Sequence, residues 1–252
     1  MAMSDSRTRG LRVCALYPDL MNIYADRGNL LVLERRCAWR GIDFQLSASG
    51  IGEPLDGGAH DIYYLGGGQD RDQLLCAEDL LVGKREALRE AAARDAVVLG
   101  VCGGYQLLGE AYALGGQRLQ GVGLLDVRTV REPGPRLIGN VAIEVDLDGR
   151  QRVLAGFENH GGRTHLGPSA LPLGQVLSGY GNDGRSGLEG ARAGNVIGTY
   201  LHGPLLPKNT WFADWLIATA LGVGLDELAP LDDDFEREAH RSARRAAGIA
   251  AA

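Results

Sequence analysis

The feature that most constrains this chain is an apolar segment, AVVLGV at residues 96–101, which runs directly into CGGYQ at residues 102–106. A short, valine-rich segment without alternation is typical of a parallel strand that helices cover on both faces of a sheet. The residues that follow must turn sharply at the carboxyl edge of that sheet, and two adjacent glycines permit such a turn. Open α/β sheets bind their ligands at this edge. The sequence therefore predicts an α/β fold with a functional residue at the turn.

Strands and helices alternate along the first half of the chain. We expect strands over residues 11–17, 42–46, 61–65 and 96–101, and helices over residues 29–40, 71–94 and 107–113. The second half is less regular, with strands expected over residues 141–145, 152–157 and 196–201, a helix over residues 211–221, and a last helix rich in Arg and Ala. This order is typical of a three-layer αβα architecture, with a mostly parallel sheet and later antiparallel additions.

The length and charge of the chain limit its class. At 252 residues it can bury a substantial core without disulfides or metals. We expect a disordered N-terminus over residues 1–10, one domain over residues 11–222, and a helical C-terminal tail over residues 223–252. A net charge of -6 without a basic stripe gives no support to nucleic-acid binding. No apolar run approaches the ~20 residues that span a bilayer, and the N-terminus lacks a secretory signal, so we expect a cytoplasmic protein without a transmembrane segment.

Cys102 is the candidate nucleophile. It lies between a buried strand and a helix N-terminus, where free backbone N–H groups and the helix dipole stabilise a thiolate. The N–H of Gly103 is then placed to donate to an oxyanion as the thiolate attacks a carboxamide. A free cysteine at a strand end is often only a small buried side chain. We keep that interpretation for Cys14, Cys37 and Cys76, because none of them precedes a glycine-rich turn.

A cysteine nucleophile needs a base, and the chain has five histidines. His202 follows an apolar strand and precedes a glycine, which places it in another loop at the sheet edge. His160 competes with it, because it also precedes glycines after a strand. An ordinary surface role fits the remaining three, which are His60, His165 and His240.

Several motifs then occur in a recognisable order. They are YADRGN at residues 24–29, GGGQDR at 66–71, VCGGYQ at 101–106, GFENHGGRT at 156–164 and TYLHGPLLPKN at 199–209. Together they resemble the class I glutamine amidotransferases, in the branch that includes the cobyric acid synthases. Within that branch, residues 11–221 are similar to the glutaminase subunits of lipid II isoglutaminyl synthases. The resemblance implies a flavodoxin-like, three-layer fold that hydrolyses L-glutamine to glutamate and ammonia.

The resemblance also implies roles for individual residues. Cys102 attacks the side-chain amide of glutamine, His202 relays protons, and water later releases glutamate from a thioester. Gly67 or Gly68, together with Gly103, supplies the oxyanion donors. The alternative for each glycine is a purely conformational role in a tight turn.

Arg136, in PRLIG at residues 135–139, matches the substrate-binding arginine of the family. A guanidinium fork there would hold the α-carboxylate of glutamine, whereas the residue pattern alone would indicate an exposed surface arginine. The stretch over residues 158–163 also resembles a family motif, but it implies no chemical step.

The chain departs from the broader class at one position. Class I enzymes usually carry His-Pro-Glu, with the glutamate orienting the histidine, whereas Pro204 stands two residues after His202 here. Another side chain of this subunit could orient the histidine, or a carboxylate of a partner subunit could complete the site. We favour the second, because a glutaminase that acted alone would waste glutamine.

The implied partner is a MurT-like Mur-ligase synthetase subunit, which would use the ammonia to amidate the D-glutamate of the lipid II stem peptide. We expect no cofactor and no metal in this chain, and ATP and any metal on the partner, because the chain has no phosphate-binding loop and no Cys/His metal cluster. Two alternatives remain. One is a corrinoid acceptor, although those enzymes usually carry the synthetase on the same chain, and the other is a non-catalytic binding module.

Overall fold

A six-stranded sheet forms the centre of the molecule in the computed structural model, which describes residues 10–23, 26–114 and 116–250. Its strand order is β13-β14-β4-β3-β1-β2. Five of these strands are parallel, and β13 (Ala191–Ala193) joins β14 in antiparallel fashion. The parallel strands are β1 (Leu11–Leu16), β2 (Phe44–Ser49), β3 (Ile62–Leu65), β4 (Val97–Val101) and β14 (Val196–Thr199). The predicted mostly parallel sheet is confirmed, with the valine-rich strand near its middle.

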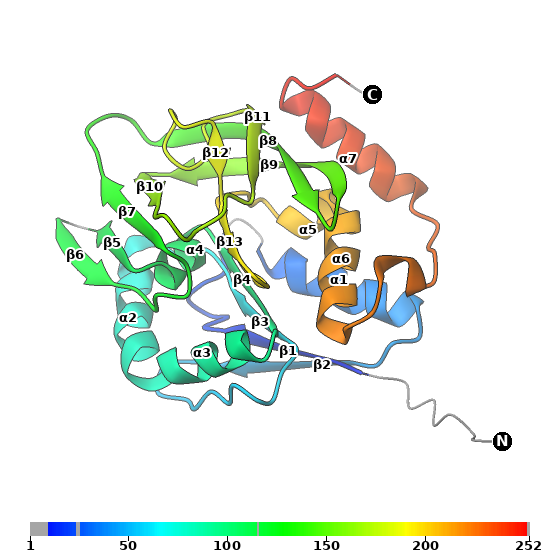
Figure 1. Ribbon diagram of the computed structural model, residues 1–252, viewed down its shortest axis with the longest axis horizontal. Coiled ribbons are helices and arrows are strands. Elements are labelled where there is room, and N and C mark those ends of the chain that lie inside the picture. The colour runs from blue at the N-terminus through cyan, green and yellow to red at the C-terminus, as the bar shows by residue number, and fades with distance from the viewer. Residues whose placement is uncertain (1–9, 24–25, 115, 251–252) are drawn as a thin grey trace.

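Helices cover both faces of this sheet, as Figure 1 shows. One layer contains α2 (Asp70–Asp79), the π-helical turn η1 (Leu80–Lys84) and α3 (Arg85–Ala93). The other contains α1 (Arg27–Trp39) and α6 (Thr210–Leu221). Because both faces are covered, every residue of β3 and β4 is buried, as their continuous apolar sequences require. The three-layer αβα architecture is therefore confirmed.

The second half of the chain adds two antiparallel-rich sheets beside this core (Figure 1). One has the order β10-β7-β5-β6, from β5 (Ala111–Leu114), β6 (Gln117–Gln120), β7 (Val127–Arg131) and β10 (Gly162–Leu166). The other has the order β12-β11-β8-β9, from β8 (Leu137–Leu147), β9 (Arg150–His160), β11 (Gly174–Ser178) and β12 (Leu188–Glu189). The long β8–β9 hairpin matters for function, because it carries residues 158–160 towards the carboxyl edge of the central sheet.

Several predicted elements differ from the structure. The helix expected over residues 107–113 is wrong: α4 (Gly103–Leu108) starts and ends earlier, and residues 111–114 form β5. Gly109 takes an extended conformation that ends the helix, and the buried Tyr112 then faces the core from a strand. The helix expected over residues 71–94 is interrupted by η1, and β2 begins two residues later than expected.

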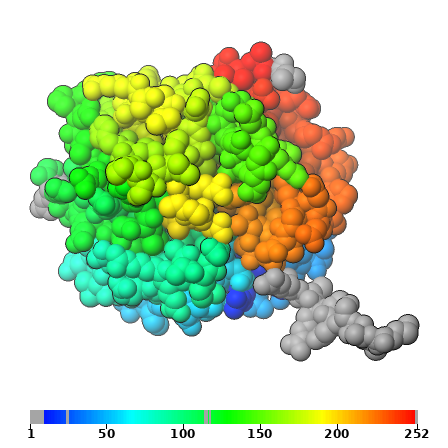
Figure 2. Space-filling view, in the orientation of Figure 1, coloured from blue at the N-terminus to red at the C-terminus, as the bar shows by residue number. Residues whose placement is uncertain are grey.

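The C-terminal tail packs on the domain. After α5 (Leu205–Lys208), α6 and the short 3₁₀ turn η2 (Leu225–Glu227), helix α7 (Asp234–Ala246) contacts α5, β8 and β9. Its His240 Nδ1 lies 2.9 Å from the carbonyl of Lys208, and Asn140 donates to the carbonyl of Ala246 at 3.0 Å. Figure 2 shows this segment, in red and orange, lying against the green strand region.

Two predictions concern the N-terminal segment and the absence of a transmembrane segment. Of the N-terminal segment predicted to be disordered, residues 1–9 lie outside the described residues. Within the described part of the chain, no helix combines the length and apolar character that crossing a membrane requires.

Candidate active site

Cys102 occupies a sharp elbow between β4 and α4. Its backbone has φ 53° and ψ -104°, a conformation that residues with a Cβ rarely adopt and that costs about 1–3 kcal/mol. Its N–H donates to the carbonyl of Thr199 on the adjacent strand at 2.8 Å, and its carbonyl accepts the N–H of Gln106 at 3.1 Å. The sheet and the helix together therefore hold the side chain at the carboxyl edge of the sheet.

The loop over residues 66–68 packs directly against this elbow. Gly104 donates its N–H to the carbonyl of Gly66 at 3.1 Å, and a Cβ at Gly104 would lie 2.2 Å from the carbonyl oxygen of Leu65. Only glycine permits such an approach. A Cβ on Gly103 would lie 3.2 Å from the backbone nitrogen of Gly68. The backbone amides of Gly68 and Gly103 are thus neighbours beside Cys102, where an oxyanion would develop.

Asp26 engages the remaining amide of this loop. Its Oδ2 accepts the N–H of Gly67 at 2.8 Å, while the Gly67 carbonyl accepts the N–H of Ile23 at 3.1 Å. Since the N–H of Gly67 already has this acceptor, Gly68 is the better partner for Gly103 in stabilising an oxyanion. The sequence assigned no role to Asp26, and its place in the motif over residues 24–29 was the one signal for it.

The buried carboxyl group of Asp26 also affects the nucleophile. Asp26 is 0% exposed, and burial raises its pKa to about 7 although the Gly67 amide opposes the shift. Within the described residues, its Oδ1 has no hydrogen-bond partner. Its charge is one cause that raises the pKa of Cys102.

Burial decides the protonation of Cys102 itself. It raises the pKa of the thiol, the charge of Asp26 adds a smaller increase, and the resulting pKa is about 12. The Gly103 amide and the Arg136 charge lower the pKa but do not compensate. The expected stabilisation of a thiolate by the helix N-terminus is thus outweighed, because burial withdraws the thiol from water. Cys102 is therefore a thiol at neutral pH.

A cavity of about 320 Å³ opens in front of the elbow. Its wall includes Gly68, Cys102, Gly103, Arg136 and His160. The structure thus brings together the predicted nucleophile, the predicted oxyanion donors and the predicted substrate-binding arginine, although these residues lie far apart in the sequence.

Arg136 is held in place by the β9 strand. Its Nε donates to Oδ1 of Asn159 at 2.9 Å, and its Nη2 donates to the backbone carbonyl of Asn159 at 2.8 Å. A second guanidinium lies nearby, because a Cβ on Gly161 would meet Arg131 Nη1 at 1.8 Å and Arg136 Nη1 at 3.4 Å. Two cations on one wall, of which Asn159 holds Arg136, suit an anionic substrate group.

His202 lies at the end of β14, the strand next to β4, and is 1% exposed. Its backbone pairs with Phe157 of β9 at 2.9 and 3.0 Å, and the two rings make an edge-to-face contact at 5.9 Å. Burial, with smaller contributions from the charges of His160, Lys208 and Arg136, lowers the pKa of His202 to about 4. The imidazole is therefore neutral at pH 7 and able to accept a proton. Among the described residues, His160 lines the cavity and His202 does not.

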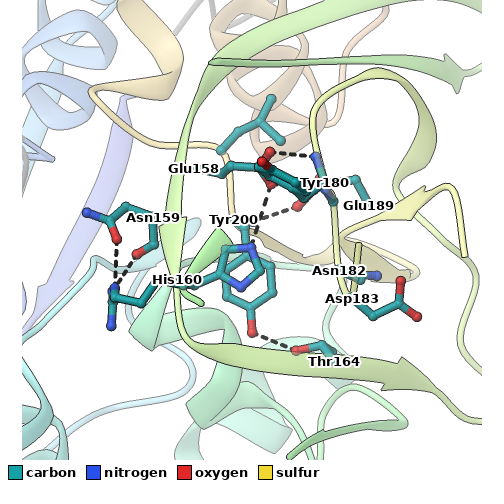
Figure 3. A network of polar contacts seen from close by, with 12 residues as sticks. Glu158, Asn159, His160, Thr164, Tyr180, Asn182, Asp183, Glu189 and Tyr200 are labelled. Atoms are coloured by element: carbon teal, nitrogen blue, oxygen red, sulfur yellow. Dashed lines mark hydrogen bonds and ion pairs between the residues drawn. The ribbon is translucent and has the colours of Figure 1, made fainter. Parts of the chain in front are cut away.

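His160 belongs to a fixed polar network, which Figure 3 shows. Its Nδ1 donates to the carbonyl of Gly162 at 2.9 Å, and its ring stacks on Tyr200 with centroids 3.6 Å apart and planes 4° from parallel. Its Nε2 lies 3.6 Å from the buried carboxylate of Glu158, which also accepts the backbone N–H groups of residues 180 and 181 at 2.6 and 2.9 Å. The motif over residues 158–163 thus builds one wall of the cavity.

The same network reaches the helix of the nucleophile. The hydroxyl of Tyr200 contacts Oγ1 of Thr164 at 2.6 Å and accepts Nε2–H of Gln106 at 3.0 Å. Oε1 of Gln106 in turn accepts Nε2–H of Gln73 at 2.8 Å. Gln73 and Gln106 both line the cavity, so the contacts fix its walls relative to Cys102.

The three other cysteines are buried in the core, as expected for residues without a catalytic role. Cys14, Cys37 and Cys76 are free and buried, and burial raises the pKa of each thiol. Within the described ranges, no group of three or more His, Cys, Asp or Glu side chains is arranged to hold a metal ion.

Comparisons with known proteins place this site in a family. Residues 12–210 match the CobB/CobQ-like glutamine amidotransferase domain. The chain is 39% identical over 213 residues to the GatD subunit of the lipid II isoglutaminyl synthase (glutamine-hydrolyzing) of Streptococcus pneumoniae, covering 84% of this chain and 80% of that one. The GatD subunit from Staphylococcus aureus is 40% identical over 203 residues, covering 80% and 81% of the two chains.

A cobyric acid synthase from Desulforudis audaxviator is 34% identical over 173 residues, covering 67% of this chain but only 34% of that enzyme. Among solved structures, PurLQS from Thermotoga maritima matches with a TM-score of 0.57 at 20% identity, covering 77% of this chain and 87% of that one. That similarity supports the fold alone. From the domain match and the two GatD relatives, the chain belongs to the CobB/CobQ-like glutamine amidotransferase family, in the branch that contains the GatD subunits.

Proposed function

We propose that this chain is the glutamine-hydrolysing subunit of a lipid II isoglutaminyl synthase and releases ammonia for a separate synthetase subunit. The observation that carries the proposal is the cavity in which the elbow cysteine Cys102, the amides of Gly68 and Gly103 and the fixed guanidinium of Arg136 converge. A nucleophile, an oxyanion site and a carboxylate-binding group are what hydrolysis of glutamine requires.

In the first half of the reaction, Arg136 holds the α-carboxylate of L-glutamine and directs the side-chain amide towards Cys102. His202, neutral because its pKa is lowered to about 4, accepts the thiol proton as sulfur bonds to the amide carbon. The carbonyl oxygen becomes an oxyanion that accepts the N–H groups of Gly68 and Gly103. The carbon–nitrogen bond then breaks, the imidazolium returns the proton to nitrogen, and ammonia leaves behind a thioester.

In the second half of the reaction, a water molecule hydrolyses the thioester. His202 accepts a proton from water as the hydroxide bonds to the thioester carbon, and the same amides stabilise the second oxyanion. The carbon–sulfur bond breaks, the proton returns to sulfur, and glutamate is released. The thiol of Cys102 is thereby regenerated.

The synthetase subunit is expected to be MurT-like and to receive the ammonia in the cytoplasm, where it amidates the D-glutamate of the lipid II stem peptide. ATP and any metal ion would bind that subunit. Two observations support a site that depends on a partner. Pro204 stands where the class usually has glutamate, and the thiol pKa of about 12 disfavours attack by the isolated subunit. The corrinoid alternative has less support, because the chain spans only 34% of the matched cobyric acid synthase against 80% of a GatD subunit.

The test is glutamate release from L-glutamine, measured for the chain alone and with a co-expressed Mur-ligase-like partner. We expect release to increase with the partner and to fall by at least about 1000-fold in Cys102→Ala, because nucleophilic catalysis is lost. Cys76→Ala is the matched control, since it removes another buried thiol, and it should stay within about 2-fold of the wild type.

Two results would count against the proposal in different ways. Equal release with and without the partner would refute the coupling but leave the glutaminase. Absence of cysteine-dependent release under both conditions would refute the glutaminase and favour a binding module.

A further inference from the structure

The charges around the cavity are unevenly distributed. The guanidinium groups of Arg131 and Arg136 lie on the wall formed by β7 and the β8–β9 hairpin. Among the described residues recorded on the cavity wall, one carboxylate is present, and it belongs to Asp70. Asp70 is the first residue of α2, two residues after Gly68. The cavity therefore presents cationic side chains from one part of the fold and an anionic side chain from another.

Both signs of charge act on the position of the nucleophile. Asp70 is among the causes that raise the pKa of Cys102, and Arg136 is among those that lower it. Asp70, Arg136 and Cys102 line the same cavity, so a ligand that reaches Cys102 can contact both charged groups. Free glutamine carries one group of each sign, an α-carboxylate and an α-ammonium, on the same carbon atom.

Building on the function proposed above, we propose that Asp70 binds the α-ammonium group of L-glutamine and so selects the free amino acid over amides that lack this group. Arg136 takes the α-carboxylate, Asp70 takes the α-ammonium, and Cys102 with its oxyanion amides takes the carboxamide. Three points of attachment around one stereocentre also distinguish L-glutamine from its mirror image. The surrounding loop supports this position, because the Gly66–Gly68 turn fixes where α2 begins relative to the elbow.

The competing explanation is that Asp70 only stabilises the start of α2. Acidic residues in a first helical turn interact favourably with the helix dipole, and α2 has two of them, Asp70 and Asp72. Asp72 is not among the residues that line the cavity. The two positions therefore share the dipole interaction, and Asp70 alone has access to the substrate. Asp72→Asn is the matched control.

The experiment compares L-glutamine with glutaramate, which is glutamine without its α-amino group. Glutamate or glutarate release is measured for the wild-type complex, Asp70→Asn and Asp72→Asn, each with the co-expressed partner. We expect Asp70→Asn to raise KM for L-glutamine by about 10- to 150-fold, the value of a hydrogen bond to a charged group. KM for glutaramate should change by less than about 3-fold, because that substrate has no ammonium to lose.

The value of kcat for L-glutamine should not fall in Asp70→Asn, because removing this carboxylate removes one cause that raises the pKa of Cys102. Asp72→Asn should leave both substrates unchanged within about 3-fold. Calorimetric binding of L-glutamine to Cys102→Ala, with and without Asp70→Asn, separates binding from turnover, and the second change should abolish measurable binding.

The possible outcomes are distinct. An equal rise in KM for both substrates, or no rise for either, would overturn the role of Asp70 while leaving the glutaminase intact. A wild-type complex that hydrolyses neither substrate would overturn the proposed function itself. If Asp72→Asn reproduces the effect of Asp70→Asn, the helix-dipole explanation replaces recognition.

Discussion

At the scale of single residues, Asp26 carries a fully buried carboxyl group close to Cys102, and burying such a group costs free energy. Asp26 holds the glycine loop through the amide of Gly67, yet it raises the pKa of Cys102 and has its own pKa raised to about 7. In the folded chain this group binds a proton that the unfolded chain, with an ordinary pKa of 3.8, has released. Its contribution to stability therefore decreases as the pH rises from about 4 to about 7.

Asp26→Asn should reverse that loss. Asparagine keeps an oxygen that can accept the Gly67 N–H but cannot ionise. Relative to the wild type, we expect the free energy of unfolding of Asp26→Asn to be larger at about pH 8 than at about pH 5, which means a more stable variant at the higher pH, as measured by urea denaturation. Asp126→Asn is the control. Ser169 lowers the pKa of Asp126, so its titration lies below this range and its difference from the wild type should be flat. A pH-independent difference for Asp26→Asn would contradict the assignment of a raised pKa.

At this scale, the position of a residue could be predicted where its neighbours define a local turn. Cys102 and its glycines could be predicted from the strand–turn–helix pattern, and Arg136 from a resemblance alone. Which glycine amide is available could not be predicted, because that depends on the distant acceptor Asp26. The protonation state of the Cys102 thiol could not be predicted either. Burial raises its pKa more than the helix N-terminus lowers it, and the extent of burial is known only from the packing.

At the scale of elements, one buried ion cluster joins three helical segments. Arg36 of α1 is 1% exposed and donates to Asp214 of α6 at 2.5 and 2.6 Å and to Asp233, just before α7, at 2.8 and 2.9 Å. Arg40 of α1 adds two bonds to Asp214 at 2.8 Å. The cluster therefore fixes α1, α6 and the start of the tail helix relative to one another.

Arg36→Ala should be strongly destabilising. Removing one partner of a buried ion pair leaves the other charge without compensation, which typically costs about 3–5 kcal/mol. Urea denaturation of the two proteins measures this difference. Arg245→Ala is the control, because it breaks only an exposed pair with Glu238 and should change the unfolding midpoint little. A loss below about 1 kcal/mol for Arg36→Ala would mean that Arg40 alone holds Asp214.

The apolar pattern of the sequence predicts some helices and strands of this chain but not others. The central strand and α6 could be predicted because their apolar patterns are long and continuous. The helix predicted over residues 107–113 was wrong, because an apolar run of this length fits a helix or a buried strand equally well. Their pairing with β6 and β7 decides the outcome, and that contact is not local in the sequence.

At the scale of the whole molecule, the tail helix is separate from the catalytic machinery. Helix α7 packs on α5 and the β8–β9 hairpin, and none of its residues lines the cavity of Cys102. No residue within α7 is buried. The tail helix is attached largely by polar contacts such as that of His240 with Lys208, and Ala247, just after the helix, is buried.

Deleting residues 234–252 should therefore leave a folded and active domain. We expect the melting temperature to fall by only about 2–8 °C, a change of roughly 1–2 kcal/mol for a chain of this size. Glutamate release in the presence of the partner should stay within about 3-fold of the full chain, because the cavity is intact. Circular dichroism and the release assay measure both quantities. A folded but inactive deletion variant would instead assign the tail to the synthetase interface.

The overall architecture was the part of the structure most accessible from sequence. Alternating strands and helices predicted the three layers, whereas the packing of the tail could not be predicted, because the mixed charges of α7 resemble those of any solvated helix. The convergence of β7, β9 and α2 around one cavity likewise follows from topology rather than from any local pattern.

Burial of the Cys102 thiol has a consequence for chemical durability. Peroxide oxidises cysteine through its thiolate to a sulfenic acid, and further oxidation to the sulfinic acid is not readily reversed. Cys102 is only 8% exposed, and with its pKa raised to about 12 its thiol is protonated at neutral pH and should react slowly with such oxidants. The burial that makes the resting thiol of Cys102 unreactive therefore also protects it from oxidation. Oxidative damage is expected mainly during catalysis, when the thiolate forms.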